Sequence, residues 1–346
     1  MINCTFIIHL KLLAVLFIMI LTQTPLRISL GGGGTDLPSY YTRFGSTFIS
    51  AAIQKYIYIF LHKRFDNQLH LKYANFETVQ NVDDIKHDLT RRIFLSNGAS
   101  NGIEVASVAD IPTGTGLGSS GSFGVGLINA VYAYTKKHAS KQDIAEEACN
   151  IEMNVLNKPV GKQDQYIAAF GGINAFEIDR NGKVTVNPLK MREDALSELQ
   201  ENLVLYYTGI TRYSSLILKL QDTKLKEHDE DMIGRLHATQ QLGLQGKTAL
   251  ENGDLRKFGE LMHVHWENKK KMVDSMSSGF VDECYTKAMQ NGAVGGKLIG
   301  AGGGGFLMFY TEDKTKLRSA LKNFGLPELP VRFDFEGSKI LINKHE

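Results

Sequence analysis

Runs of apolar residues predict the strands of this chain. Residues 44–65 are rich in Ile, Phe and Tyr and alternate in part between apolar and polar positions, which predicts one or two strands. Shorter apolar runs predict further strands at residues 25–30, 102–108, 203–207 and 303–310. Residues 173–186 contain an Asn181-Gly182 pair, which suits a tight turn, so this segment predicts a hairpin.

Apolar residues spaced three and four apart predict the helices. Residues 123–134 have this spacing, and a second helix opens at Ser140, where Ser140 and Asp143 resemble a capping box. The apolar face of that second helix would consist of Ile144, Ala148, Ile151 and Val155. Residues 163–170 predict a shorter helix, and residues 214–290 are expected to be mainly helical. Together these elements predict an α+β fold in two lobes.

The lobes are expected at residues 22–195 and 196–346, with a boundary near residues 190–201. Residues 1–21 are interpreted as an apolar extension. Its run at residues 12–21 resembles a signal-peptide core, but it is shorter than the ~20 residues that span a bilayer, and no small-residue cleavage site follows. Because Met19 directly precedes the predicted first strand, we interpret residues 1–18 as a misassigned start in preference to a membrane anchor.

Composition limits the function further. The chain has 346 residues, of which 43% are hydrophobic and 22% charged, as in an ordinary soluble globular protein. A net charge of +2 without a basic stripe argues against nucleic acid as a partner, and Lys269-Lys-Lys271 is interpreted as a solvated helix face. Three widely separated cysteines give neither a disulfide framework nor a metal-ligand spacing, which favours the cytoplasm.

A glycine- and serine-rich loop is the strongest chemical signal. It connects the predicted strand 102–108 to the predicted helix 123–134. Small residues at a helix N-terminus expose backbone N–H groups and add partial positive charge, and hydroxyls can bind phosphate or magnesium. The loop therefore predicts a site for a nucleoside triphosphate, formed by Pro112, Gly114, Gly116, Leu117, Gly118, Ser119, Ser120, Gly121 and Ser122.

Other phosphate motifs match less well. Residues 116–121 and 300–305 both satisfy the glycine pattern of dinucleotide-binding folds, but neither lies in a β-α-β unit with an acidic residue about twenty positions later. Residues 243–248 imitate the end of a Walker A loop, yet Gln241 stands where that motif needs glycine. We therefore set both alternatives aside.

Three ordered motifs resemble those of the GHMP small-molecule kinases: residues 25–36 (Pro-Leu-Arg-Ile-Ser-Leu-Gly-Gly-Gly-Gly-Thr-Asp), 112–122, and 297–306 (Lys-Leu-Ile-Gly-Ala-Gly-Gly-Gly-Gly-Phe). The wording of residues 24–41, 157–166 and 207–215 is most similar to the D-glycero-D-manno-heptose 7-phosphate kinases. The resemblance implies an N-terminal ATP-binding lobe like ribosomal protein S5 domain 2 and a ferredoxin-like C-terminal lobe.

The resemblance also implies roles for single residues. Asp164 matches the family's aspartate at the acceptor hydroxyl, as base or as orienting group, although it could merely cap its helix. Arg27 matches the arginine near the transferred phosphoryl group. Glu152, otherwise an ordinary surface glutamate, and Ser120 match the magnesium ligands.

The implied substrate residues are Asp36, Gly33, Gly34, Arg212, Gly302 and Gly303. Asp36 would accept hydrogen bonds from sugar hydroxyls, or it could only close a turn. Gly31 to Gly34 replace a bulkier family segment, which argues against galactose and would leave room for a larger or phosphorylated sugar. Arg212 could bind a remote phosphate or be purely structural.

The expected function is an ATP- and magnesium-dependent sugar kinase. The implied acceptor is the anomeric hydroxyl of D-glycero-D-manno-heptose 7-phosphate, which would give the 1,7-bisphosphate for lipopolysaccharide or capsule precursors. The alternatives are another sugar 1-kinase, such as a fucokinase, and a silent regulator on the same fold. Intact Arg27, Ser120, Glu152 and Asp164 argue against the regulator.

Overall fold

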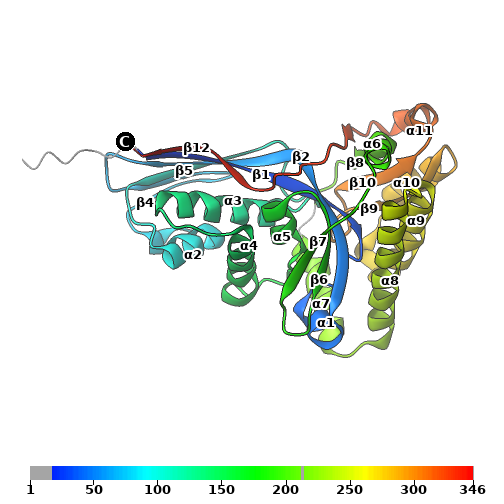
Figure 1. The fold of residues 1–346 in the computed structure, drawn as a ribbon, viewed down its shortest axis with the longest axis horizontal. Helices are drawn as coiled ribbons and strands as arrows, with labels where there is room; N and C mark the ends of the chain where they lie inside the picture. Colours follow the sequence, from blue (N-terminus) through cyan, green and yellow to red (C-terminus); the bar gives the residue numbers. More distant parts are fainter. Residues whose placement is uncertain (1–17, 212–213, 346) are drawn as a thin grey trace, which may run out of the picture.

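The computed structural model describes residues 18–211 and 214–345, which form two sheets with helices packed on them (Figure 1). The first sheet has eight strands in the order β12-β1-β2-β5-β3-β4, with β6 and β7 branching from β2. Its strands are β1 (Ile18–Gly31), β2 (Ser46–Lys63), β3 (Leu69–Lys72), β4 (Phe76–Val79), β5 (Ile103–Ala109), β6 (Ile173–Ile178), β7 (Val184–Pro188) and β12 (Lys339–His345).

Strand β2 organises the first sheet, because its length lets it pair with three neighbours. It is antiparallel to β1 along most of its course. Its first half pairs with β6 from Ser46 to Ala51, and its second half pairs with β5 from Ile57 to Lys63. The predicted strands of residues 44–65 are therefore one continuous strand. The hairpin predicted at residues 173–186 is confirmed as β6 and β7.

Helices cover one face of this sheet (Figure 1). They are α2 (Asp88–Asn97), α3 (Ser119–Tyr134), α4 (Lys141–Asn150) and α5 (Gln163–Phe170). Helix α3 is buried on nearly every side, and Val125, Leu127 and Ile128, which point in different directions around the helix, are all part of the core. The predicted capping box at the start of α4 is confirmed, with the Ser140 and Asp143 side chains bonded reciprocally to backbone N–H groups.

The second sheet has the strand order β11-β8-β10-β9, and all of its pairs are antiparallel. Counted along the chain this order is 4-1-3-2, the split β-α-β arrangement that the ferredoxin-like expectation requires. The strands are β8 (Leu203–Tyr207), β9 (Ala293–Leu298), β10 (Phe306–Thr311) and β11 (Glu328–Pro330). The helices of this part are α7 (Ser214–Lys226), α8 (Glu230–Asn252), α9 (Leu255–Lys270), α10 (Gly279–Met289) and α11 (Lys314–Leu321).

Short elements complete the chain. Helix α1 (Pro38–Phe44) contacts α7. The others are α6 (Glu193–Asn202), a five-residue π-helical turn (Ile151–Val155), and 3-10 turns at Val82–Asp84, Asp274–Met276 and Lys322–Phe324. In Figure 1, α8 and α9 run side by side along the second sheet. The mixture of helices and antiparallel sheets confirms the predicted α+β class.

The sheets do not follow the predicted boundaries of residues 1–21, 22–195 and 196–346. Strand β1 begins at Ile18, so residues 18–21 belong to the first sheet, where Ile18 pairs with His345. The C-terminal strand β12 also joins that sheet, although it lies in the predicted second lobe. Pairing between residues more than three hundred positions apart leaves no local signal in the sequence. The rest of the predicted extension, residues 1–17, lies outside the described residues.

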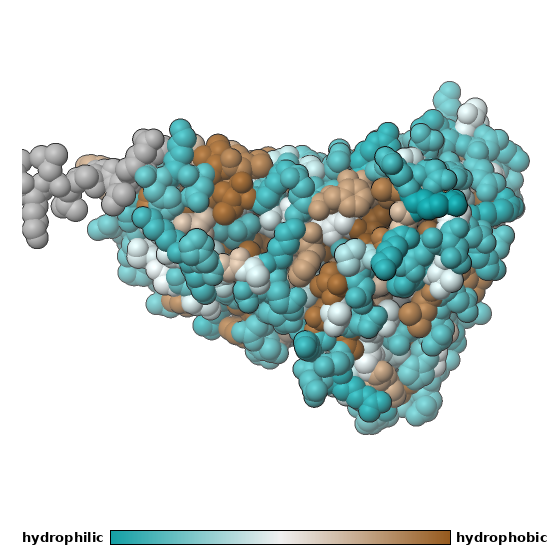
Figure 2. All heavy atoms as spheres, viewed as in Figure 1, coloured by the Kyte–Doolittle hydropathy of each residue, from teal (hydrophilic) through white to brown (hydrophobic). Residues whose placement is uncertain are grey.

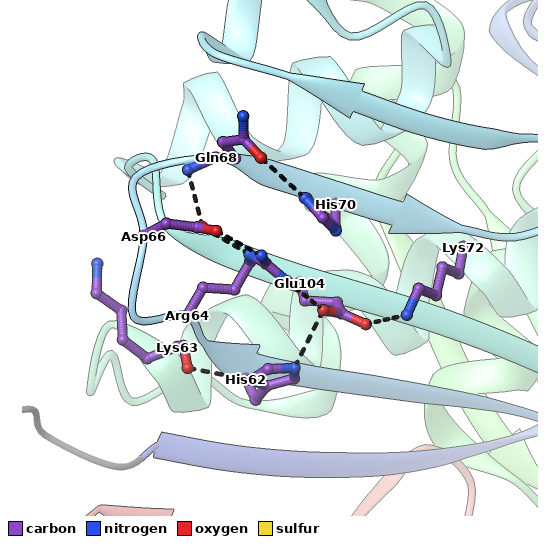
Figure 3. Close-up of polar contacts among 8 residues, drawn as sticks. All are labelled: His62, Lys63, Arg64, Asp66, Gln68, His70, Lys72 and Glu104. Carbon is purple, nitrogen blue, oxygen red and sulfur yellow. Dashed lines mark hydrogen bonds and ion pairs between the residues drawn. The ribbon is translucent and has the colours of Figure 1, made fainter.

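Charged side chains cover much of the surface, and Figure 2 shows a mostly hydrophilic face with smaller apolar areas. One ionic cluster lies where β2 turns into β3 (Figure 3). There Glu104 accepts from Arg64 at 2.7 Å and from Lys72 at 2.5 Å, while Arg64 also pairs with Asp66 at 2.6 Å. These cations and carboxylates satisfy one another, so the cluster stabilises the sheet edge and offers no free charge. Within the described ranges, no helix has the length and apolar character needed to cross a membrane.

Close backbone contact between α9 and β9 predicts one stability effect. A Cβ at Gly295 would overlap the carbonyl oxygen of Gly259 and lie 3.2 Å from the backbone nitrogen of His263. Gly295→Ala should therefore push the helix off the strand and lower the free energy of unfolding by about 1–3 kcal/mol or more, measured by urea denaturation.

The matched control is Gly234→Ala on α8, where a Cβ would meet nothing within 4 Å. This substitution should raise stability by up to about 1 kcal/mol through helix propensity. A Gly295→Ala protein as stable as the parent would contradict the close packing of α9 on β9.

Candidate active site

Two glycine loops that are almost two hundred residues apart in the chain meet at the centre of the molecule. The first follows β5, and the second connects β9 to β10. A Cβ added at Gly300 would lie 2.7 Å from the Cα of Gly116, and one added at Gly116 would lie 2.7 Å from the carbonyl oxygen of Ile299. The φ angle is also positive at both glycines, 83° at Gly116 and 80° at Gly300. The two loops therefore pack backbone against backbone at a point that only glycine allows.

Helix α3 begins inside the first loop, at Ser119, four residues earlier than predicted. Its N-cap is Gly118, whose φ of 79° is left-handed and which has no side chain to cap the helix. The Ser119 hydroxyl is buried and has no hydrogen-bond partner among the described residues. An uncapped helix N-terminus with an unpartnered buried hydroxyl suits phosphate oxygens. The residues present therefore fit the predicted triphosphate.

One predicted phosphate ligand has a different task. The Ser122 hydroxyl is fully buried and donates to the carbonyl oxygen of Pro25 at 2.8 Å. It connects α3 to β1, so we correct its assignment from phosphate binding to the fold. Leu117 is also buried in the core, and its carbonyl oxygen accepts from the backbone N–H of Arg27 at 3.0 Å.

Arg27 and Asp164 form an ion pair beside this helix N-terminus. Arg27 projects from β1, and its Nε donates to Asp164 Oδ1 at 2.7 Å. Its Nη1 donates to the carbonyl oxygen of Gly116 in the first loop. Asp164 lies in the first turn of α5, and a Cβ at Gly121 would lie only 2.7 Å from its Cβ. The first turns of α3 and α5 thus converge on one charged pair, which joins two residues that the sequence analysis named separately.

Glu152 and Ser120 meet at the predicted magnesium position. The Ser120 hydroxyl donates to Glu152 Oε2 at 3.0 Å, and the amide of Gln165 donates to Oε1 at 3.1 Å. Glu152 is 1% exposed, and burial raises the pKa of its carboxyl above the usual value, with a smaller contribution from the charge of Asp164. A hydroxyl and a carboxylate beside a phosphate site are hard oxygen donors of the kind that magnesium binds, so these residues fit the ion.

Glu152 continues the inward stripe of α4, because it lies three and four positions after the buried Cys149 and Ala148. The predicted apolar face placed Val155 in the core with Ile151, but Val155 is 41% exposed while Ile151 is buried. An extra residue in the turn shifts the phase of the helix after Asn150. The shift turns Val155 outward, whereas Glu152 is buried and is not the surface glutamate that its sequence alone would suggest.

Asp36 has the structural task that its sequence left open. Its Oδ2 accepts from the backbone N–H of Gln163 at 3.0 Å, at the start of α5, and its Oδ1 accepts from Gly34 at 3.2 Å. Burial raises the pKa of this carboxyl, and the charge of Asp164 adds to the rise. Asp36 therefore closes its turn and holds the N-terminus of α5. Each carboxylate oxygen keeps a second lone pair, so a role toward sugar hydroxyls remains a proposal.

The glycines before Asp36 serve close packing. A Cβ at Gly31 would lie 2.8 Å from the Cα of Gly243 on α8, and one at Gly33 would lie 2.9 Å from Ser29 Oγ. Gly34 accepts from the side chain of Gln221 on α7 at 3.0 Å. This differs from the expectation that Gly31 to Gly34 open room for a larger sugar. Helices and strands occupy the space that the missing side chains leave.

The second loop is also closely packed. The backbone N–H of Gly303 donates to the carbonyl oxygen of Met276 at 2.9 Å, and a Cβ at Gly302 would overlap the Met276 sulfur. These two glycines therefore pack against the turn after α9, and their assignment as substrate ligands stays a prediction. Arg212, the predicted ligand of a remote phosphate, lies outside the described residues.

Sequence reasoning missed a group of cations under the second loop. Lys269, expected on a solvated face, turns inward and donates to the carbonyl oxygens of Leu298, at 3.4 Å, and Gly300. Lys297 donates to the carbonyl oxygen of Leu30 at 3.1 Å and lies 3.4 Å from His265 Nδ1. One signal was available, because Phe258, Met262, His265 and Lys269 follow the inward stripe of α9.

The residues that converge can neutralise and position phosphate groups. A helix N-terminus, an Arg–Asp pair and a hydroxyl–carboxylate pair occupy one site. Phosphoryl transfer needs such groups to position the reactants and to neutralise phosphate charge. Among the described residues, no group of three or more His, Cys, Asp or Glu side chains could bind a metal alone. An ion at Glu152 would therefore share its coordination with substrate phosphates.

Comparisons with known proteins agree with this chemistry. Residues 85–172 match the family model for the N-terminal domain of GHMP kinases, and residues 247–325 match the model for their C-terminal domain. The chain is 34% identical over 315 residues to the D-glycero-alpha-D-manno-heptose 7-phosphate kinase of Campylobacter jejuni, covering 87% of this chain and 91% of that protein.

Two further relatives are more distant. A solved structure described as a D-glycero-D-manno-heptose 1-phosphate kinase from Bacteroides thetaiotaomicron superposes with a TM-score of 0.77 at 27% identity, covering 93% of this chain and 99% of that one. The bifunctional fucokinase/GDP-fucose pyrophosphorylase of Arabidopsis thaliana is 25% identical, with 86% of this chain aligned to 30% of that protein.

The buried Glu152 carboxyl predicts a dependence of stability on pH. Its pKa is raised above the ordinary value of about 4.5 in the folded protein. Ionising it therefore lowers the free energy of unfolding, and this loss grows as the pH rises from about 4.5 through the raised pKa. Glu152→Gln avoids this cost and can keep hydrogen bonds to Ser120 and Gln165. The variant should melt at a higher temperature than the parent at pH 7.5, with a smaller difference near pH 4.5, in thermal denaturation without added metal.

Glu201→Gln on exposed surface is the control and should leave the melting temperature nearly unchanged at both pH values. If Glu152→Gln is no more stable at pH 7.5 than at pH 4.5 relative to the parent, the folded protein does not hold Glu152 at a raised pKa.

Proposed function

The chain belongs to the GHMP kinases and is an ATP-dependent sugar kinase, and on this premise we propose that its acceptor is D-glycero-D-manno-heptose 7-phosphate. Phosphorylation of the anomeric hydroxyl would give the 1,7-bisphosphate, a precursor for surface polysaccharide. The observation that supports this acceptor most strongly is the 34% identity to a heptose 7-phosphate kinase, over 91% of that protein.

We propose that the triphosphate of ATP lies against the N-terminus of α3. There the backbone N–H groups of the first turn and the hydroxyl of Ser119 would donate to its oxygens. Ser120 and Glu152 would hold magnesium, which neutralises phosphate charge when bound. The guanidinium of Arg27, fixed by Gly116 and Asp164, would neutralise the charge that develops on the transferred group.

Asp164 would act on the acceptor hydroxyl. Arg27 fixes its Oδ1, whereas Oδ2 has no hydrogen-bond partner among the described residues, and the side chain is 31% exposed. An oxygen that is oriented and accessible can accept the hydroxyl proton, or orient the hydroxyl in a largely dissociative transition state. The pair thus places a proton acceptor and a cation at the same reaction centre.

A second acceptor class has one observation in its favour. The chain is 25% identical to a plant protein named as a fucokinase, and fucose is an unphosphorylated sugar. An unphosphorylated acceptor is therefore the second candidate. A silent regulator is disfavoured, because the structure brings together the four polar residues that catalysis would require: Arg27, Ser120, Glu152 and Asp164.

Removing the carboxylate of Asp164 tests its role. Asp164→Asn should lower kcat by a factor on the order of 10² or more, because the amide cannot accept the proton. Steady-state kinetics would measure the loss, and circular dichroism with nucleotide titration would show that the fold and ATP binding persist. The control is Asp231→Asn, which breaks an Arg235–Asp231 pair of the same 2.7 Å length on the surface of α8. A kcat within threefold of the parent would exclude Asp164 as the base.

A panel of acceptors tests the substrate. We expect kcat/KM for heptose 7-phosphate to exceed that for the unphosphorylated heptose, for heptose 1-phosphate and for fucose by about 100-fold, the value of about 2.7 kcal/mol of selective binding. Phosphorus NMR would place the new phosphate on the anomeric carbon. If fucose or the free heptose is used as efficiently, the proposed acceptor is wrong while the kinase assignment stands.

Arg212 belongs to the same experiment. If its guanidinium binds the remote phosphate, Arg212→Ala should raise KM for heptose 7-phosphate by about 10- to 100-fold and leave KM for ATP unchanged. The unphosphorylated heptose is the internal control, since its KM should barely change.

A further inference from the structure

Two lysines under the second glycine loop have no carboxylate partner. Lys269 donates to the carbonyl oxygens of Leu298 and Gly300, and Lys297 donates to that of Leu30. Among the described residues neither lysine makes an ion pair, and the only carboxylate paired with nearby Arg27 is Asp164. The site therefore contains three cationic side chains, Arg27, Lys269 and Lys297, and within the described ranges only the carboxylate of Asp164 is paired with any of them. A bound anion would balance the remaining positive charge.

The geometry of the loops sets Lys269 beside Arg27. Arg27 donates to the carbonyl oxygen of Gly116, and Lys269 donates to that of Gly300. These two glycines are in contact, because a Cβ on Gly300 would lie 2.7 Å from the Cα of Gly116. The first loop thus holds Arg27 through the carbonyl of Gly116, and the second loop holds Lys269 through the carbonyl of Gly300. The two cations lie on either side of the contact between these glycines.

Accessibility distinguishes the two lysines. Lys297 is 2% exposed and shares its neighbourhood with His265, so it lies behind the site. Lys269 is only partly buried. A ligand that enters the site can therefore reach Lys269 but not Lys297.

We propose that Lys269 is a second phosphate-binding cation, which acts with Arg27 on the terminal phosphate of ATP across the junction of the two glycine loops. The proposal rests on the placement of Arg27 at the transferred group. Lys269 is held by the loop that touches the phosphate loop, whereas the acceptor side of Arg27 is occupied by Asp164. This position favours the phosphate of the nucleotide over that of the sugar.

Charge and burial around Lys269 give the proposal a distinctive signature. The groups that face it are Arg27 on β1, Lys297 on β9 and His265 on α9. Burial, with the charge of Arg27, lowers the pKa of Lys269 to about 7. A bound terminal phosphate would favour the ammonium form, so binding at pH 8 should take up a proton. ADP lacks that phosphate and should cause less uptake.

Calorimetry on the full chain tests this. A non-hydrolysable ATP analogue and ADP, each with magnesium, would be titrated at pH 8 in buffers of different ionisation enthalpy. Lys269→Met should weaken analogue binding by about 10- to 100-fold, change ADP binding less than threefold, and abolish the extra proton uptake. Lys269→Arg should retain most of the affinity but lose the proton uptake, because a guanidinium is already charged.

The control is Lys271→Met, which removes an exposed lysine from the same stretch and should change nothing. Equal weakening of the analogue and ADP would overturn the proposal, because it would indicate a structural role. So would unchanged binding of the analogue to Lys269→Met, because Lys269 would then not bind the terminal phosphate.

The stability of Lys269→Met supplies a second check. A lysine with a lowered pKa costs stability fully below about pH 7, and this cost shrinks as the pH rises toward the ordinary value of about 10.4. The free variant should therefore melt above the parent at pH 6.5, with a smaller gain at pH 9.5, even though it binds the analogue less well. A variant that is less stable at pH 6.5 would contradict the uncompensated charge.

Failure of the proposed acceptor would leave these binding experiments unaffected, since they contain no sugar. Arg27→Met, run in parallel, isolates the premise. If it leaves analogue binding intact while Lys269→Met weakens it, the placement of Arg27 is wrong and the assignment of Lys269 stands.

Discussion

The contact between Gly116 and Gly300 is the constraint on which the site depends. It joins a loop of the first sheet to a loop of the second, and a side chain on either residue would separate them. The carbonyl oxygens of the same two glycines hold Arg27 and Lys269. The contact therefore fixes the spacing of the layers and the spacing of two cations at once, which couples the fold directly to the chemistry.

The site is energetically costly in the free protein. Burial raises the pKa values of Asp36 and Glu152, and the charge of Asp164 adds to both. Burial lowers the pKa values of Lys269 and Lys297, and Arg27 adds to both. Each charge is thus disfavoured by desolvation and by a neighbour of like sign. Ligands that bring phosphate and magnesium would relieve both effects, so the cost of the free site would favour their binding.

The sequence could predict those features that local motifs determine. The helix predicted at Gln163–Phe170 is confirmed. Arg27, Asp164, Ser120 and Glu152 were named from family motifs, and the structure brings Arg27 to Asp164 and Ser120 to Glu152, while their catalytic roles stay predictions. Features that depend on distant contacts were missed. The periodicity of α9 indicates that Lys269 points inward, but its carbonyl partner at Gly300 lies in a loop about thirty residues later, and the return of β12 to β1 needs a partner at the other end of the chain.

The charges of the site are sorted by layer. Asp36, Glu152 and Asp164 come from the segments around the first sheet, whereas His265, Lys269 and Lys297 come from α9 and β9. Arg27 lies between them and contacts one acid and one loop. A triphosphate at the N-terminus of α3 would therefore turn its terminal phosphate toward the cations of the second layer, while the metal and the acceptor hydroxyl would lie toward the first. The first layer alone supplies only Arg27 among these cations, so we expect phosphoryl transfer to need the two sheets docked, and the glycines that allow this docking would matter to function as much as the side chains that touch substrate.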